Sequence, residues 1–530
     1  MNRRNEKIGI YDSCGPRLRS HRFLGMTQSL CPTCYAVVEA KIIERDGRVY
    51  FQKFCSEHGE RIDFVCSDAA WFDRLEFNVP GREPVKYGVL PDRGCPYDCG
   101  LCTRHEQHTC IGIVEITDAC NLTCPLCYAS SSPGKQHLSL TECQAAIERL
   151  VEVEGRPEIL QLSGGEPTIH PEFEAVFKFA CEQPIDLVMV NTNGIRFAHD
   201  RDLCELLAVH SERAHVYLQM DGLSENIHVP LRGASLLEQK LKAIERLGEY
   251  GINTTLVTTL QAGVNFNEIS PLVKFAESRR WITGLSFQPA TYVGRWFEPE
   301  HLDQRVTFPD VIAEVVRTSN GRYAETDFFP VPCAHPNSHT LCYAYRTSNE
   351  VVPITRFVDM QQNFDLLSNG ISLTRKQSRK IIEQYLQRAA CGPDCDCLQG
   401  SEEAGGFLGP KINNDAMKGL PVLSAANRGG EQVSTSSEAH SELSRLAGNF
   451  FAGALSDQLA AADMFRITTT SFMDAYNFDL RQLMKSCVHH VLPSGHIIPF
   501  DAYNVFYRTG RLPLPNLTGT RKACDTTRTS

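Results

Sequence analysis

The chain has 530 residues, of which 42% are hydrophobic and 22% are charged, values that are ordinary for globular proteins. Its length predicts three or four domain-sized units. The formal net charge of -10 argues against a nucleic-acid-binding protein, because such proteins contact phosphates through basic faces. The sequence has no apolar run of membrane-spanning length and no apolar signal-peptide core, so we expect a cytoplasmic protein without a membrane span.

Cysteine is the unusual residue, with 22 copies in the chain. Because cytosolic thiols stay reduced, so many cysteines indicate bound metal rather than a disulfide framework. Many of them occur in tight clusters, which supports this interpretation.

The first cluster lies in an N-terminal module, residues 1–80, around a β-rich run at Val49–Phe54. The pattern C-P-T-C, 20 residues, C-S-E-H-G is typical of a zinc ribbon or rubredoxin-like site, which is usually structural. The predicted ligands are Cys31, Cys34, Cys55 and His58. Cys66 is an alternative to His58, and the spacing is compatible with either zinc or iron.

The second cluster lies in residues 81–110 and reads C-P-Y-D-C-G-L-C, seven residues, C. Four thiolates at these spacings suit an auxiliary four-iron cluster, with a zinc site as the alternative. The predicted ligands are Cys95, Cys99, Cys102 and Cys110.

From residue 111 to about 365, short apolar runs alternate with amphipathic stretches. The predicted strands are Ile113–Thr117, Ile159–Ser163, Leu187–Asn191, Val216–Met220, Thr254–Thr259 and Leu285–Gln288. The predicted helices include Leu140–Glu154, Leu236–Tyr250 and Glu268–Ser278, the first with a capping box at Ser139 and Glu142. Strand–helix units in this order predict an α/β fold with a parallel sheet, open or partly closed into a barrel, and chemistry at the carboxyl ends of its strands.

A third cysteine cluster, C-N-L-T-C-P-L-C-Y, directly follows the first of these strands. Its thiols belong to Cys120, Cys124 and Cys127. One loop can wrap three thiolates around an iron–sulfur cluster and leave one iron with an open position, whereas a zinc knuckle would need a fourth ligand.

The next strand ends carry further polar motifs: S-G-G-E-P-T at 163–168, N-T-N-G at 191–194 and Q-M-D-G at 219–222. Gly164 and Gly165 would let the backbone approach a ligand without a Cβ clash. Asn193, Gln219 and Asp221 are candidates for ligand contact or for structural turn residues.

The cysteine loop with Tyr128 and the strand ends that follow it resemble the radical S-adenosylmethionine (SAM) superfamily. The resemblance implies a partial (β/α)6 barrel and a [4Fe-4S] cluster held by the three loop cysteines and an exchangeable SAM. It also implies that Glu166 and its glycine turn hold the SAM amino group, and that Asn193, Gln219 and Asp221 contact SAM or substrate. The implied reaction is reductive cleavage of SAM to a 5′-deoxyadenosyl radical that attacks an unactivated C–H bond, with an electron donor such as flavodoxin or ferredoxin.

The order of ribbon, auxiliary segment and core resembles the multi-cluster radical SAM proteins that include tetraether lipid synthase and pterin dimethyltransferase-like enzymes. Shared motifs lie at Gly284–Arg295, Pro332–Asn337 and Cys487–Asn504. The resemblance implies C–C bond formation or one-carbon transfer on a lipid, a pterin or another small molecule. Alternatives are a peptide- or natural-product-modifying enzyme and a non-enzymatic, metal-stabilised binding module.

The family's third cluster is incomplete in this sequence. Ser338 and Asp501 occupy two positions where the resemblance implies cysteines, while Cys333 and Cys487 are present and Cys342 is a candidate substitute. We therefore expect two iron–sulfur clusters and one mononuclear zinc or iron. The run C-G-P-D-C-D-C is outside the family pattern and offers another metal site or spare thiols at Cys391, Cys395 and Cys397.

The rest of the chain is less regular. Residues 366–440 are predicted to form a variable region with a linker at Ser401–Glu438. Residues 441–530 are predicted to form an α+β C-terminal module with a helix near Glu442–Phe465 and a disordered tail after Pro513.

Overall fold

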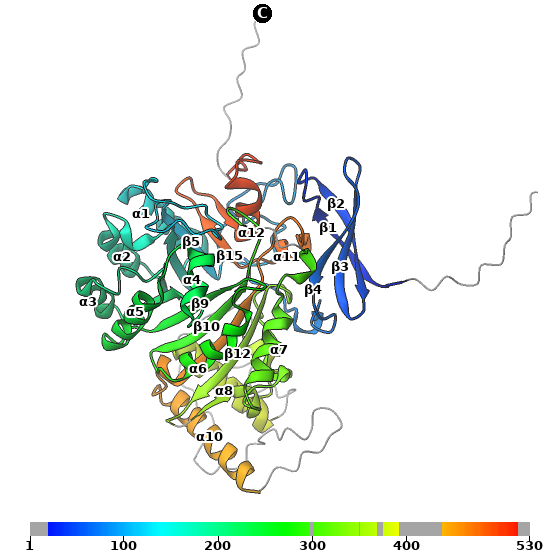
Figure 1. Cartoon of the computed structure of the whole chain (residues 1–530). Coiled ribbons are helices and arrows are strands. Elements are labelled where there is room, and N and C mark those ends of the chain that lie inside the picture. Colours follow the sequence, from blue (N-terminus) through cyan, green and yellow to red (C-terminus); the bar gives the residue numbers. More distant parts are fainter. Residues whose placement is uncertain (1–19, 297–300, 349, 368–374, 392–436, 518–530) are drawn as a thin grey trace, which may run out of the picture.

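The computed structural model describes residues 20–296, 301–348, 350–367, 375–391 and 437–517. These residues form two sheets, one from the start of the chain and one from all the later strands (Figure 1). The first sheet is an antiparallel meander of β1 (Arg22–Leu30), β2 (Val37–Arg45), β3 (Arg48–Cys55) and β4 (Gly59–Cys66). It includes the predicted strand at Val49–Phe54, in β3.

Six parallel strands form the centre of the second sheet, in chain order across the sheet. They are β5 (Ile111–Thr117), β6 (Ile159–Gly164), β7 (Leu187–Thr192), β8 (Ala214–Gln219), β9 (Thr254–Leu260) and β10 (Ile282–Pro289). All six predicted strands are present within a few residues of their expected bounds. The predicted α/β class with a parallel sheet is therefore confirmed.

Later residues extend this sheet at both edges. The additional strands are β11 (Phe329–Pro330), β12 (His339–Arg346), β13 (Val351–Pro353), β14 (Met464–Thr470), β15 (Val488–Val491) and β16 (Ile497–Pro499). β14 pairs in parallel with β10, and β15 pairs in parallel with β5. Residues of the predicted C-terminal module thus belong to the same sheet as the core.

Helices between the strands cover the outer face of the sheet and bury their apolar sides against it (Figure 1). They are α1 (Leu140–Glu154), α2 (Phe173–Glu182), α3 (Arg201–Val209), α4 (Glu225–Arg232), α5 (Leu237–Glu249) and α6 (Ile269–Glu277). α1 begins at the predicted capping box, in which Ser139 and Glu142 satisfy each other's backbone amides. Later helices are α7 (Phe308–Thr318), α8 (Arg375–Cys391), α10 (Ser437–Leu455), α11 (Leu480–Met484) and α12 (Phe500–Ala502).

Short single-turn elements complete the described secondary structure. The 3-10 turns are η1 (Leu75–Phe77), η2 (Pro167–Ile169), η3 (Phe266–Glu268), η4 (Leu302–Gln304), η5 (Glu325–Asp327), η6 (Ile354–Arg356), η7 (Phe364–Leu367) and η10 (Ala461–Asp463), and η11 (Tyr503–Tyr507) is a π-helical turn. Of these, η2 directly follows Glu166, and η11 contacts the loop that carries Cys99.

The helix predicted near Glu442–Phe465 is wrong at its C-terminal end. α10 ends at Leu455, two residues before Asp457 takes a left-handed φ of +57°. The following I-T-T-T run is rich in β-branched residues, which favour strands, and it forms most of β14. Phe465 is therefore a buried strand residue, and β14 fills the position between β10 and β12.

The first sheet is joined to the C-terminal residues by a buried lysine. Lys53 Nζ forms an ion pair with Asp63 at 3.1 Å, and both side chains are 2% exposed. The same nitrogen donates to the carbonyl oxygens of Ala475 (3.3 Å) and Tyr476 (2.6 Å). These contacts orient the sheet against the segment that follows β14.

Two predicted regions lie largely or partly outside the described residues. The linker at Ser401–Glu438 is outside them except for the start of α10, and so are Cys395 and Cys397. The tail is described as far as Leu517, which pairs with Val89, and residues 518–530 are not described. Among the described helices, none is both long and apolar enough to cross a membrane.

Candidate active site and metal centres

The three cysteines of the loop after β5 gather at the wall of an internal cavity. Cys120, Cys124 and Cys127 all border this cavity, which has a volume of about 260 Å³. The loop begins where β5 ends, at the carboxyl ends of the parallel strands. Burial raises the pKa of Cys120 to about 12 and also raises that of Cys124, because a thiolate is poorly solvated there. A loop that carries three thiols suits a metal cluster, because metal ions stabilise the ionised form of their thiolate ligands.

A segment at Gly294 and Arg295 holds the cysteine loop in shape. The backbones of Cys127 and Arg295 exchange two hydrogen bonds of 2.9 Å, and Arg295 Nε donates to the Cys124 carbonyl oxygen at 2.9 Å. Gly294 has a φ of +70°, and a Cβ there would lie 2.2 Å from the carbonyl oxygen of Tyr128. The C-terminal end of the motif at Gly284–Arg295, which carried part of the family resemblance, therefore positions the three thiols through Gly294 and Arg295.

The glycine turn after β6 packs against the backbone of the same loop. A Cβ at Gly164 would lie 2.1 Å from the Thr117 carbonyl oxygen, and one at Gly165 would lie 2.1 Å from that of Ala119. The sequence interpretation assigned these glycines to close approach of a ligand. The structure shows that they also let two loops approach each other, while both glycines still border the cavity.

Four protein donors satisfy the carboxylate of Glu166. Oε1 accepts from Thr168 N (3.1 Å), Thr168 Oγ1 (2.5 Å) and Thr192 Oγ1 (2.7 Å), and Oε2 accepts from Asn193 N (2.7 Å). The side chain is 1% exposed, and burial raises its pKa. Glu166 thus connects η2 to the end of β7 beside cavity-lining residues, and its contact with the SAM amino group stays a prediction.

The other predicted strand-end residues form one polar network. Asn193 Nδ2 donates to Asn121 Oδ1 in the cysteine loop (2.7 Å), and Gln219 Nε2 donates to Asp221 Oδ2 (2.6 Å). Asn193 and Gln219 border the cavity. Asp221 is fully buried and accepts two hydrogen bonds of 2.7 Å from Arg232. Asp221 does not border the cavity itself; its carboxylate holds the guanidinium of Arg232, which does.

Two buried cations complete this network, and sequence reasoning missed both. Arg232 borders the cavity near Cys124, where its charge opposes the increase in the thiol pKa. Lys240 Nζ donates to the carbonyl oxygens of Asn193 (3.0 Å) and Gln219 (2.6 Å), and burial lowers its pKa to about 8. Both lie on amphipathic helices, where a basic residue usually faces solvent, so no sequence signal distinguishes them from surface charges.

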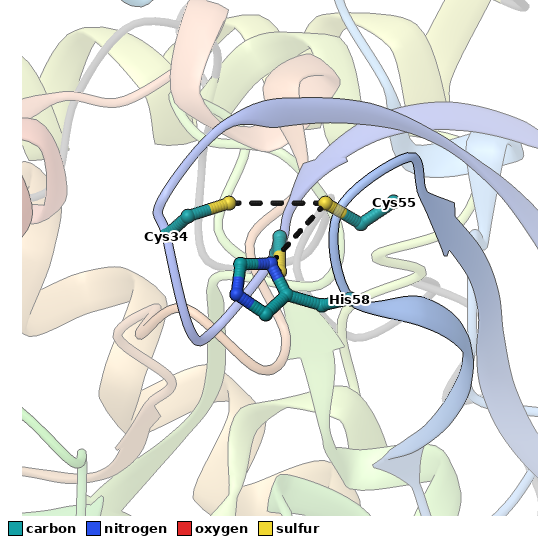
Figure 2. A group of neighbouring side chains, drawn as sticks. Cys34, Cys55 and His58 are labelled. Carbon is teal, nitrogen blue, oxygen red and sulfur yellow. Dashed lines mark hydrogen bonds between the residues drawn. The ribbon is translucent and has the colours of Figure 1, made fainter.

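The ribbon residues converge at one end of the first sheet. Figure 2 shows the side chains of Cys34, Cys55 and His58 directed toward one another, and Cys31 completes a group whose ligand atoms all lie within 4.8 Å. The Sγ atoms of Cys34 and Cys55 are 3.8 Å apart, close to the separation that two zinc–sulfur bonds of about 2.3 Å give in a tetrahedral site. Cys66 instead belongs to the hydrophobic core, where burial raises its pKa to about 12. The geometry thus favours His58 as the fourth ligand.

The C-P-Y-D-C-G-L-C loop brings three further thiols near one another. Burial raises the pKa of Cys95 to about 11 and also that of Cys99, and the Cys102 thiol adds to both increases. The Tyr507 hydroxyl, in η11, accepts a hydrogen bond from Cys99 N at 2.9 Å and anchors the loop. Asp501 stands where the resemblance implies a cysteine; its charge also acts on Cys99, and burial raises its pKa to about 7.

Cys110 is not grouped with these three residues, contrary to the prediction. Its Sγ lies within 4.8 Å of those of Cys333 and Cys487, which are themselves 3.7 Å apart. The reason is sheet pairing, since Cys110 N and Ile111 N both donate to the Cys487 carbonyl oxygen where β5 meets β15. The structure thus assigns Cys110 to the incomplete third set of cysteines. We call this group the buried cysteine trio.

Cys342, the candidate substitute for a missing cysteine of the third set, does not lie with the trio. Leu341 borders the cavity, so its neighbour Cys342 points to the opposite face of β12 and does not join the trio. His339 lies beside Cys487 and also borders the cavity, so the trio is close to the cavity wall. All three trio thiols are fully buried, and burial raises the pKa of Cys110.

Comparison of the sequence with known proteins identifies the family to which the chain belongs. A model described as the radical SAM superfamily matches residues 114–276, and one described as the HMPTM N-terminal zinc ribbon domain matches residues 23–67. The chain is 32% identical over 515 residues to 7,8-dihydro-6-hydroxymethylpterin dimethyltransferase from Methanocaldococcus jannaschii, covering 91% of this chain and 94% of the relative. The chain belongs to the radical SAM superfamily. Within it, this radical SAM enzyme is a member of the same family as the dimethyltransferase.

Other relatives match smaller parts of the chain. GTP 3',8-cyclase from Chlorobaculum tepidum is 28% identical over 243 residues, which is 44% of this chain and 68% of the cyclase. A crystal structure of SuiB from Streptococcus suis bound to its precursor peptide SuiA aligns at 16% identity with a TM-score of 0.33, covering 41% of this chain and 46% of SuiB.

These findings confirm the predicted class. The chain is a radical SAM enzyme rather than a metal-stabilised binding module, and its superfamily uses a [4Fe-4S] cluster and SAM. The residues present fit these groups, because three thiols of one loop border a cavity that the glycine turn and the polar strand ends also line. The N-terminal sheet is likewise confirmed as a zinc ribbon by its family match.

Proposed function

We propose that this enzyme transfers one-carbon units to a pterin, replacing hydrogen at an unactivated carbon. The observation that supports this proposal is the 32% identity with the Methanocaldococcus jannaschii dimethyltransferase, which extends over 91% of the chain. The match therefore includes the ribbon, the auxiliary cysteines and the strands from the C-terminal residues, all of which lie outside the superfamily match at 114–276.

When bound, the cluster and SAM supply the electron and the 5′-deoxyadenosyl radical that breaks the C–H bond. The chain's own residues bind and orient these groups. In this proposal Cys120, Cys124 and Cys127 hold the cluster, while Gly165 and Asn193 border the SAM site. Glu166 receives the SAM amino group, and Arg232 places a positive charge beside the cluster loop, where the SAM carboxylate would be stabilised.

The cavity has the mixed lining that a flat heterocycle with polar edges requires. Its apolar wall is formed by Ile113, Met189, Val257 and Leu341 from four strands and by Phe472, which follows β14. Polar groups of β8 and β10 meet across β9: Tyr217 donates to Ser286 Oγ (2.7 Å), and Gln288 Nε2 donates to the Tyr217 hydroxyl (3.1 Å). Apolar faces with a few placed polar groups are typical of small-molecule sites.

The remaining cysteine groups are proposed to hold auxiliary metals. The ribbon residues would bind one zinc or iron ion, and the Cys95 loop would contribute three thiolates to an auxiliary cluster near Asp501. The buried cysteine trio would supply three thiolates for a fourth metal site, in addition to the two clusters and one mononuclear ion that we expected. A flavodoxin or ferredoxin is the proposed electron donor, and the cytoplasm the proposed location.

The proposal is tested with the anaerobically reconstituted enzyme, SAM, a reductant, a methyl donor and the neutral alcohol 6-hydroxymethyl-7,8-dihydropterin. We expect 5′-deoxyadenosine together with a pterin product whose mass has increased by one or two CH2 units, because each methyl group replaces one hydrogen. Formation of 5′-deoxyadenosine with no alkylated pterin, over a range of pterin and methyl-donor concentrations, would contradict the assignment of substrate while leaving the enzyme class intact.

A further inference from the structure

Three arginines border the central cavity, and they differ in how their charge is satisfied. Arg232 is paired with Asp221, and Arg295 donates to the carbonyl oxygens of Cys124 and Ser131 at 2.9 and 2.6 Å. Arg466 has no such partner: within the described part of the chain its guanidinium forms no ion pair, and its one hydrogen bond is a long contact of 3.5 Å to Thr255 Oγ1.

The fold makes room for this arginine. Arg466 lies on β14 opposite Gly284 of β10 and Tyr343 of β12. A Cβ at Gly284 would lie 2.7 Å from Arg466 Cγ and 3.3 Å from its Nε, so only glycine leaves the side chain its path into the cavity. Gly284 belongs to the same sequence motif as Arg295 but lies near the start of β10, where a Cβ would meet Arg466 and not the cysteine loop.

Arg466 lies far from the cluster loop along the strand direction. It is four residues before the end of β14, which corresponds to about 13 Å at 3.3 Å per strand residue. The loop with Cys120, Cys124 and Cys127 follows the carboxyl end of β5, at the opposite end of the cavity's long wall. A ligand that reaches Arg466 is therefore the substrate rather than the SAM that contacts the strand ends.

The electrostatics of the cavity call for a negative charge on that ligand. No Asp or Glu is among the described residues that border it. His215, which contacts Thr255 at 2.8 Å, is held neutral because burial and the charge of Arg466 lower its pKa to about 3. Two other buried arginines of the described structure are satisfied by protein groups: Arg305 pairs with Asp474 at 2.6 Å, and Arg346 donates to backbone carbonyl oxygens, among them that of Ile282 at 2.9 Å. Arg466 is partly buried at the cavity wall, so water solvates its charge incompletely and an anionic ligand would stabilise it.

We infer that Arg466 binds an anionic oxygen group, a phosphate or carboxylate, at the end of the substrate distant from the reacting carbon. This inference rests on the proposed function and deepens it: the substrate is a pterin that carries an acidic substituent. Thr255 Oγ1 contacts both Arg466 and His215, so it keeps the guanidinium directed into the cavity until the anion binds. The guanidinium fork suits both kinds of oxyanion, which contact it through two oxygens.

The test compares 6-hydroxymethyl-7,8-dihydropterin with its phosphate ester and with a carboxylate-bearing analogue, measured by equilibrium binding to the reconstituted, SAM-loaded enzyme and by product formation. An anionic ligand should bind about 10- to 100-fold more tightly than the neutral alcohol. Arg466→Gln should abolish that preference, and Arg466→Lys should retain part of it. Gly284→Ala should weaken anion binding in the same way, because its Cβ displaces the arginine.

The control is Arg280→Gln, since Arg280 is half-exposed and paired with Asp463 at the start of the same strand. It should bind all three ligands as the unmodified enzyme does. In every variant SAM affinity and substrate-free cleavage of SAM should stay unchanged, and circular dichroism should report the same fold. The affinities for the phosphate ester and for the carboxylate-bearing analogue show which acidic group the enzyme prefers.

Equal affinity for neutral and anionic pterins, an unchanged preference in Arg466→Gln, or a loss of SAM affinity in that variant would each overturn the inference. If no pterin binds or is alkylated, the proposed function fails instead. The inference is then decided by inorganic phosphate and acetate: at least one of them must protect the unmodified enzyme, but not Arg466→Gln, against thermal unfolding, and protection by neither overturns it.

Discussion

Strand β5 connects two groups of cysteines that this enzyme assembles in different ways. At its carboxyl end, Cys120, Cys124 and Cys127 come from one loop. At its amino end, Cys110 meets Cys333 and Cys487, two residues that are 154 positions apart in the chain. The first group is encoded by local spacing. The second depends on the pairing of β15 with β5, and on the segment between β11 and β12, from the opposite edge of the same sheet, which brings Cys333 to within 3.7 Å of Cys487.

The two groups also differ in their access to the cavity. All three loop cysteines border it, and the charge of Arg232 acts on one of them. The trio cysteines are fully buried in an apolar cluster and reach the cavity only through neighbours such as His339 and Val488. An open position for a ligand is thus available at the loop, while the trio is suited to a closed metal site.

The largest expected effect comes from removing the loop thiols. Changing Cys120, Cys124 and Cys127 together to Ala should abolish 5′-deoxyadenosine formation, because no other described cysteine group offers an exchangeable position at the cavity. The matched control replaces three core cysteines on the outer helices, Cys143, Cys181 and Cys204, and should keep the activity. The measurement is chromatographic detection of 5′-deoxyadenosine under reductant, and retained cleavage in the loop variant would refute the assignment.

Removing the trio thiols should have a different effect. Changing Cys110, Cys333 and Cys487 to Ala should lower the bound metal while leaving some SAM cleavage, since the loop and the strand ends that border SAM are intact. Metal content by mass spectrometry, with iron and zinc measured separately, decides which metal is present. A loss of about four irons would show a third cluster, a loss of about one metal ion would show a mononuclear site, and an unchanged metal content would show that the trio binds none.

The contrast between the groups explains what could be predicted from sequence. The C-x3-C-x2-C loop, the glycine turn and the alternation of strands and helices are local patterns, so the class and the six parallel strands could be predicted. The grouping of Cys110 depends on a strand pair 377 residues apart along the chain (Cys110 with Cys487, 487 − 110), and spacing alone favoured its nearest cysteine neighbours. Arg466 could not be predicted as a cavity residue for the same reason: it reaches the cavity only because β14 pairs with β10 in the sheet.

A smaller effect is expected at Glu166. Glu166→Gln keeps the shape but removes the charge, so SAM affinity should fall by about 10- to 100-fold, the equivalent of a charge-assisted hydrogen bond of about 1.5–3 kcal/mol. The four donors to Glu166 add a structural effect, because the amide would present an N–H group to one of them. Thr168→Val, which removes one of those donors and keeps the charge, separates the two contributions. Iron content should be unchanged in both variants, and equal SAM affinity in Glu166→Gln and the unmodified enzyme would remove this residue from the SAM site.

The smallest effect on catalysis is expected in the ribbon, whose four ligand residues also come from local spacing but lie on a different sheet. His58→Ala should lose one bound metal ion and lower the thermal stability of the N-terminal sheet, because metal binding and folding are coupled in such modules. Cys66→Ala is the comparison: it should keep the metal and cost about 1 kcal/mol of unfolding free energy through lost core packing, since this thiol lies in the hydrophobic core. Metal content and thermal unfolding of the two variants distinguish the roles. If Cys66→Ala lost the metal and His58→Ala kept it, the ligand set would be four thiolates and the geometry of Figure 2 would not be that of the metal-bound ribbon. SAM cleavage should persist in both variants, because none of these residues borders the central cavity.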